Sequence, residues 1–183
     1  DGTGNSWYYG DIAVKDGKII SIGKLSNAVA TKTIDAKGLI VAPGFIDVHG
    51  HIEGGVFERP TADNYIYDGV TTVITGNCGG SAESMKNFFH QLDCMKTSIN
   101  IASLIGHNTV RRQAMGLDDR LATPVEQKKM EELVAQGMKE GAVGLSTGLI
   151  YLPGMYSNTE EVVGLAKSAA AYGGIYASHI RNE

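Results

Sequence analysis

The chain has 183 residues, of which 43% are hydrophobic and 20% charged, so it fits one folded domain, or one domain plus a piece of another, and its composition is not that of a disordered chain. Its formal net charge is −4 and its lysines and arginines are scattered, which argues against a nucleic-acid or anionic-membrane partner. No apolar run approaches the ~20 residues that a membrane-spanning helix requires.

The first forty or so residues predict a small all-β segment. Asp16 and Gly17 tolerate positive φ, which favours a hairpin turn between two apolar runs. The same pattern recurs around Gly38, and Pro43 and Gly44 end the segment. The expected strands are 11–14, 19–22, 33–35 and 39–42.

From Phe45 onward, continuously apolar runs alternate with helix-like stretches. Pro124 suits the first turn of a helix, and Thr159 is expected to cap another, with Glu160 and Glu161 favoured by the helix dipole. The expected strands are 45–48, 70–75, 99–105, 143–146 and 175–178, and the expected helices are 64–68, 82–95, 125–139 and 159–172.

Five β/α alternations predict an α/β fold with a parallel sheet whose two faces are covered by helices. An open doubly wound sheet and a (β/α)8 TIM-type barrel both fit this pattern. A complete barrel takes ~250 residues, or ~30 per β/α unit, so the later segment holds between four and five units. We therefore expect part of a small β domain over 1–42 and a partial barrel over 43–183.

His49 and His51 stand two residues apart at the end of the first barrel strand. Period-two geometry places both imidazoles on one face, and in a barrel that face lies at the rim where catalytic groups collect. Two imidazoles on one rigid strand form half of a site for a first-row metal. A chance His-x-His on a loop is the alternative, and the preceding apolar strand and Pro-Gly break favour the metal.

Cys78 follows the second strand within the sequence GNCGG, where small neighbours would allow a metal to approach. A thiolate is a strong zinc ligand, whereas a free cysteine at a tight turn is equally well explained as a small buried residue. With Cys94 it makes no disulfide framework, so we expect a reducing, cytoplasmic compartment. Removal of a signal peptide stays an alternative, because the sequence begins at Asp1 and not at a methionine.

Two more histidines follow strand ends. His179 ends the fifth strand, and ligand-type residues at three strand ends favour coordination over a buried structural role. His107 ends the third strand, where a metal ligand, a residue that supports the ligands and the start of a turn held by Arg111 are the alternatives. We expect His107 and Arg111 to support the ligands without binding the metal. A serine hydrolase is disfavoured because Ser146 and Thr147 lack the context of a nucleophile elbow.

Taken together, the motifs resemble the amidohydrolase superfamily, and in particular its D-aminoacylase branch, the N-acyl-D-amino-acid deacylases. The similarity runs from about residue 11 to 183. One departure is the sequence IEGG directly after His51, where many members carry acidic residues. The matching segments are 42–51 (APGFIDVHGH), 76–79 (GNCG), 106–111 (GHNTVR), 144–151 (GLSTGLIY) and 178–183 (SHIRNE).

The resemblance implies a (β/α)8 barrel beside a small β-sandwich, binding one or two zinc ions. It implies hydrolysis of linear N-acyl-D-amino acids by metal-bound hydroxide. A catalytic aspartate and a further histidine would come from later strands, beyond Glu183. The implied metal ligands are His49, His51, Cys78 and His179, and Tyr151 is the implied substrate-binding residue.

Two alternatives stand beside this interpretation. A dihydroorotase- or hydantoinase-like hydrolase of cyclic amides shares the Pro-Gly-Phe-Ile-Asp-x-His-x-His motif, but those enzymes usually use a modified lysine where Cys78 is expected here. The other alternative is a truncated barrel that is inactive alone and whose apolar edge after the fifth strand needs a partner.

Overall fold

The computed structural model describes residues 2–182, so Asp1 and Glu183, the outer limits of the two predicted domains, lie outside the description. The chain divides into two compact units, Asp1–Pro43 and Gly44–Glu183. We describe each unit by itself. The assignment of the first unit to a small β-sandwich domain stays a prediction.

The predicted hairpin of the first unit is confirmed. Strands β1 (Asp11–Lys15) and β2 (Lys18–Gly23) pair antiparallel. Asp16 and Gly17 between them have φ of 52° and 71°, the left-handed conformation that this turn requires.

The prediction of two further strands in this unit is wrong. Residues 33–35 and 39–42 form no strand, although a turn joins them in which the Leu39 amide donates to the Ala36 carbonyl over 2.9 Å. A β-strand is held by a ladder of hydrogen bonds to a neighbour. Within residues 2–43 the only such ladder joins β1 to β2, so apolar character alone does not make these segments strands.

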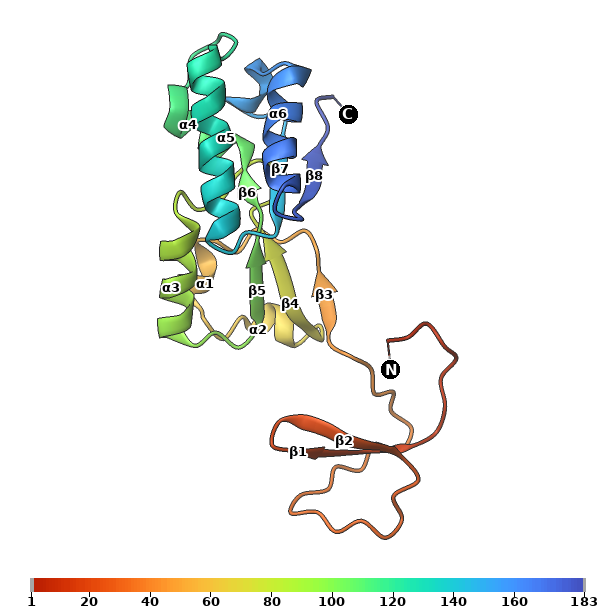
Figure 1. Ribbon diagram of the computed structural model, residues 1–183. Helices are drawn as coiled ribbons and strands as arrows, with labels where there is room; N and C mark the ends of the chain where they lie inside the picture. Colours follow the sequence, from red (N-terminus) through yellow and green to blue (C-terminus); the bar gives the residue numbers. More distant parts are fainter. Residues whose placement is uncertain (1, 183) are drawn as a thin grey trace. The chain divides into compact units, whose positions relative to one another are not determined.

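The second unit contains two three-stranded parallel sheets, with strand orders β3-β4-β5 and β6-β7-β8 (Figure 1). The predicted strands are confirmed, with small shifts of their ends. Their bounds are β3 (Phe45–Asp47), β4 (Val70–Thr75), β5 (Asn100–Ser103), β6 (Ile105–Gly106), β7 (Gly144–Gly148) and β8 (Ile175–His179).

Strands β5 and β6 are two halves of the single predicted strand 99–105, separated by Leu104. The first half pairs with β4 and the second with β7, and the Val143 amide donates to the Ser103 carbonyl over 2.9 Å. The strand order therefore follows the chain order without reversal. A doubly wound sheet reverses its order at a switch point, so this unit is a partial (β/α)8 barrel.

The helices fall largely where the sequence predicts them. Helix α5 begins at Pro124, and α6 is capped by Asn158 rather than Thr159, because the Asn158 side chain accepts a hydrogen bond from the Glu161 amide over 2.9 Å. In the described part of the chain no helix combines the length and apolarity needed to cross a membrane. The bounds are α1 (Gly55–Glu58), α2 (Asp63–Ile66), α3 (Met85–Met95), α4 (His107–Met115), α5 (Pro124–Lys139), η1 (Gly154–Tyr156, 3-10) and α6 (Thr159–Ala170).

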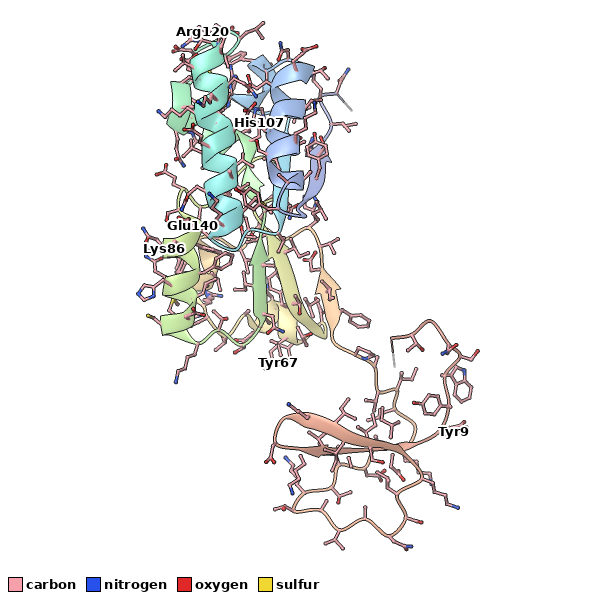
Figure 2. All side chains as sticks on the ribbon, viewed as in Figure 1. Tyr9, Tyr67, Lys86, His107, Arg120 and Glu140 are labelled. Carbon is pink, nitrogen blue, oxygen red and sulfur yellow. The ribbon has the colours of Figure 1, made fainter. Side chains whose placement is uncertain are left out.

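Helices α5 and α6 lie side by side against the β6-β7-β8 sheet (Figure 1). Their apolar side chains meet strand residues such as Leu145 in the main core, whose most deeply buried members are Met85, Val110, Met130, Val134, Leu145, Leu165 and Ala169. Figure 2 shows the end of α5 beside α3, where the Lys86 amide donates to the Glu140 carboxylate over 3.0 Å. A second core cluster includes Ile52, directly after His51, and Val73 of β4, so it packs the segment after β3 against the neighbouring strand of the candidate site.

Candidate metal centre

Three of the predicted ligands converge. One ligand atom from each of His49, His51 and Cys78 lies within 4.8 Å of the other two. Cys78 Sγ is 3.3 Å from His49 Nε2, and the two imidazole rings have centroids 5.3 Å apart. Two imidazole nitrogens and one thiolate sulfur are a donor set that suits zinc.

His49 and His51 lie just past the end of β3, because that strand ends at Asp47. The Asp47 carboxylate accepts a hydrogen bond from the His49 amide over 2.9 Å. Gly50 between the histidines is buried, its amide donates to the Ile74 carbonyl of β4 over 2.9 Å, and a Cβ there would lie 2.3 Å from a Val73 methyl. The backbone is thus pressed against β4 while both imidazoles stay exposed.

Cys78 lies in a tight turn directly after β4, with φ of 54°. Gly76 and Gly79 on either side also have positive φ, of 77° and 78°. Burial raises the pKa of the half-buried Cys78 thiol above its usual value. Binding of a metal ion would therefore release the thiol proton, as the thiolate is the form that coordinates.

Glu53 connects the segment after His51 to the same turn. Its carboxylate accepts a hydrogen bond from the Gly76 amide over 2.6 Å. This residue belongs to the IEGG departure noted in the sequence. The structure therefore gives the departing segment a contact with the cysteine turn.

His179 lies at the end of β8 and does not join the three-residue group formed within residues 2–182. Its Nδ1 donates to the Ile180 carbonyl over 3.0 Å, and its Nε2 is 3.4 Å from the Tyr151 hydroxyl. The two rings stack edge to face, with centroids 5.0 Å apart. The roles of His179 as a ligand and of Tyr151 in substrate binding stay predictions.

His107, labelled in Figure 2, is the first residue of α4, a helix that the sequence pattern did not predict. His107 and Arg111 of this helix are both fully buried. Both contact Glu161 of α6: His107 Nε2 donates to one carboxylate oxygen over 2.8 Å, and Arg111 Nη1 to the other over 2.5 Å. Burial raises the pKa of Glu161, but the hydrogen bonds from His107 and Arg111 outweigh it and hold the pKa below its usual value. Their expected support of the metal ligands stays a prediction.

Three buried polar residues hold the turn at Cys78 or the α4 side chains, and the sequence alone does not predict these roles. Glu161 was explained by the helix dipole alone, Ser146 was considered only as a nucleophile, and Asn77 was not singled out. Ser146 bonds to the turn that carries Cys78, and Asn77, which lies within that turn, donates to the Ile74 carbonyl of β4. Their signal was their presence within the motifs GNCGG and GLSTG, whose small residues indicate close backbone approach.

Comparison with known proteins identifies the family. The profile of the amidohydrolase family matches residues 32–175. An N-acyl-D-glutamate deacylase of Alcaligenes xylosoxydans xylosoxydans is 38% identical over 205 residues, covering 100% of this chain and 42% of the relative. A D-aminoacylase of the same organism is 35% identical over 206 residues, covering 100% of this chain and 43% of the relative. The chain thus spans about two fifths of the curated relatives that it matches.

Solved structures agree. A crystal structure of D-aminoacylase matches the whole chain with a TM-score of 0.94 at 32% identity, and the match covers 44% of that protein. The N-acyl-D-glutamate deacylase of Bordetella bronchiseptica, complexed with zinc and a phosphonate inhibitor, matches with a TM-score of 0.95 at 39% identity over 43% of its length. The chain therefore belongs to the amidohydrolase family, in its D-aminoacylase branch.

Proposed function

We propose that this chain supplies the metal-binding part of an enzyme that hydrolyses the amide bond of N-acyl-D-amino acids. The observation that carries the proposal is the cluster of His49, His51 and Cys78 at the strand ends of a partial barrel. The likeness to N-acyl-D-glutamate deacylase and D-aminoacylase supports the substrate class. The zinc in the Bordetella relative supports the choice of metal.

The residues of the cluster suit a holding role. A bound zinc ion would supply a Lewis acid for the amide carbonyl and would lower the pKa of a water toward ~7. His49 and His51 would bind as neutral imidazoles, and the Cys78 thiolate would reduce the net positive charge of the centre. None of the three would transfer protons while coordinated, so proton transfer to the leaving amine is assigned to a carboxylate outside this set.

His179 and Tyr151 are proposed as a second group at the same rim. The Ile180 carbonyl accepts the Nδ1 proton of His179, an arrangement that orients many metal-binding histidines. The contact with Tyr151 would place a phenol next to that imidazole, where it can donate to a substrate oxygen. We propose a small N-acyl amino acid as the partner and, because the site uses a thiolate, a reducing compartment.

The direct test is a substrate panel with the intact, zinc-loaded protein. We expect release of the free amino acid from N-acyl-D-amino acids and little release from the matched L enantiomers. A chelator should abolish this activity, and added zinc should restore it. Hydrolysis of cyclic ureides without any action on N-acyl-D-amino acids would contradict the proposal. Activity that persists after removal of metal ions by a chelator would contradict the proposed dependence on a metal ion.

A second test concerns the ligand assignment. Cys78→Ala removes one of three clustered donors, so we expect zinc content and activity to fall together. The matched control is Cys94→Ala, which removes an exposed thiol on α3. Metal analysis of the purified variants measures the effect, and full zinc occupancy in Cys78→Ala would exclude Cys78 as a ligand.

A further inference from the structure

A buried hydroxyl closes the turn that carries Cys78. Ser146 lies on β7 and is fully buried. Its Oγ accepts a hydrogen bond from the Gly79 amide over 3.1 Å and donates to the Gly76 carbonyl over 2.5 Å. One side chain thus holds the backbone on both sides of Cys78, across 67 and 70 residues of sequence.

Asn77 connects the same turn to the two histidines. Its side chain is buried, and its amide nitrogen donates to the Ile74 carbonyl over 3.0 Å. The same nitrogen lies 3.4 Å from the carbonyl of Gly50, the residue between His49 and His51. Asn77 therefore connects the turn to β4 and to the segment of the two histidines, whereas Ser146 connects it to β7.

Close backbone packing removes the remaining freedom of the turn. A Cβ on Gly148 would lie 2.1 Å from the Cys78 carbonyl oxygen, and a Cβ on Gly106 would lie 2.3 Å from the Gly79 carbonyl oxygen. Cys78 itself has φ of 54°, in the region that side-chain-bearing residues seldom adopt. A cysteine stays in this conformation when its surroundings hold it there.

We propose that Ser146 and Asn77 are positioning residues that fix Cys78 Sγ beside His49 Nε2 before a metal ion arrives. Neither side chain belongs to the donor cluster, yet both set where the sulfur lies. The inference rests on the metal centre proposed above. Its consequence is that the affinity for zinc depends on a serine hydroxyl on the fourth β/α unit.

The test is Ser146→Ala in the intact protein, with two measurements. The first is the zinc dissociation constant from competition with a chromophoric chelator. The second is the sulfur-to-cobalt charge-transfer absorption of the Co²⁺-loaded protein, which reports the thiolate bond directly. The control is Ser157→Ala, which removes another buried serine hydroxyl that closes a turn, over 2.6 Å to the Gly154 carbonyl.

We expect Ser146→Ala to weaken zinc binding by about 10- to 100-fold, the usual effect of removing a group that orients a metal ligand. The charge-transfer band should weaken or shift, while Ser157→Ala keeps the wild-type constant and band. A folded Ser146→Ala protein with unchanged affinity and an unchanged band would overturn the inference. If Ser146→Ala does not fold, the same two measurements are made on Asn77→Ala, for which weaker zinc binding and an altered band support the inference and unchanged values overturn it.

The wild-type protein separates this inference from the function on which it rests. A wild-type charge-transfer band that disappears in Cys78→Ala supports the thiolate ligand whatever Ser146 does. A wild-type protein that binds Co²⁺ without such a band would overturn both the ligand assignment and the positioning roles. An unchanged band together with an unchanged zinc affinity in Ser146→Ala would overturn the positioning inference and leave the thiolate assignment standing.

Discussion

Both carboxylate oxygens of the buried Glu161 accept hydrogen bonds from buried side chains, one from His107 and the other from Arg111. Arg111 also donates to the Arg120 carbonyl over 2.6 Å. The network joins α4, α6 and the loop before α5. Removing its central charge would leave a buried guanidinium without its carboxylate partner.

We predict that Glu161→Gln lowers the free energy of unfolding by about 3 kcal/mol at neutral pH, the typical cost of breaking a buried ion pair. The exposed neighbour Glu160 provides the control, because Glu160→Gln should change stability by less than about 0.5 kcal/mol. Chemical denaturation of the intact protein measures both values.

The same variant has a defined pH dependence. Because the pKa of Glu161 is lowered on folding, its stabilising contribution is present above the unfolded pKa of about 4.3 and is lost as pH falls through the folded pKa. The stability gap between wild type and Glu161→Gln should therefore narrow below about pH 4.3. A gap that stays constant between neutral and acidic pH would show that the charge of Glu161 does not carry the effect.

At this scale, sequence reasoning located the donors but not the residues that hold them. His49 and His51 were predicted because they directly follow an apolar strand, whose end lies at the rim of a barrel, whereas Cys78 was predicted as a ligand from the resemblance to the family. The partners of Ser146 and Glu161 lie 50 to 70 residues away in the chain. A local pattern carries no information on such contacts.

Helix α5 shows a start that is encoded locally. The Thr123 hydroxyl accepts a hydrogen bond from the Glu126 amide over 3.3 Å, and the Glu126 carboxylate accepts one from the Thr123 amide over 2.8 Å. With Pro124 in the first turn, these bonds form a complete capping box. The first turn of α5 therefore has partners for amides that would otherwise be unsatisfied.

We predict that Thr123→Ala lowers the free energy of unfolding by about 1 kcal/mol, because an N-cap alanine cannot accept the first-turn hydrogen bond. Lys128→Ala, at an exposed position within the same helix, is the control and should be nearly neutral. Chemical denaturation reports the difference. Equal stabilities of the two variants would mean that the cap contributes nothing measurable.

Elements were predictable where local signals and packing agreed. Helices α5 and α6 have caps and an apolar face, and strands β4 and β8 are rich in β-branched and aromatic residues and are bounded by glycine or loops. Helix α4 was missed because its polar residues, His107 and Arg111 among them, are buried by tertiary contacts that no periodicity reveals. The strands predicted over 33–35 and 39–42 do not form for the opposite reason: the local sequence favours a strand, but no partner strand pairs with either segment within residues 2–43.

At the scale of the whole barrel unit, the two outer strands have unpaired edges among residues 44–182, because β3 pairs with β4 alone and β8 with β7 alone. Large apolar side chains on these strands are exposed, Ile46 to 61% and Ile175 to 55%. Unpaired edges with exposed apolar residues promote association between chains.

We predict that the 183-residue chain, produced by itself, self-associates and binds a hydrophobic dye. Size-exclusion chromatography with light scattering over a range of concentrations measures the association. Ile175→Lys on β8 should reduce it, whereas Val125→Lys, at an exposed apolar position of α5, should not. A chain that stays monomeric and does not bind the dye at every concentration would contradict the prediction.

If His49, His51 and Cys78 hold a metal ion as proposed, the order of the strands also sets when that centre can assemble during translation. His49 and Cys78 are separated by 29 residues and emerge from the ribosome within one β/α unit, but Ser146 follows Gly79 by 67 residues. At the usual rate of synthesis this delay lasts roughly 3 to 13 seconds. A metal ion captured in that interval would meet a thiol that Ser146 does not yet hold, so the proposed positioning role implies that tight binding waits for the fourth β/α unit.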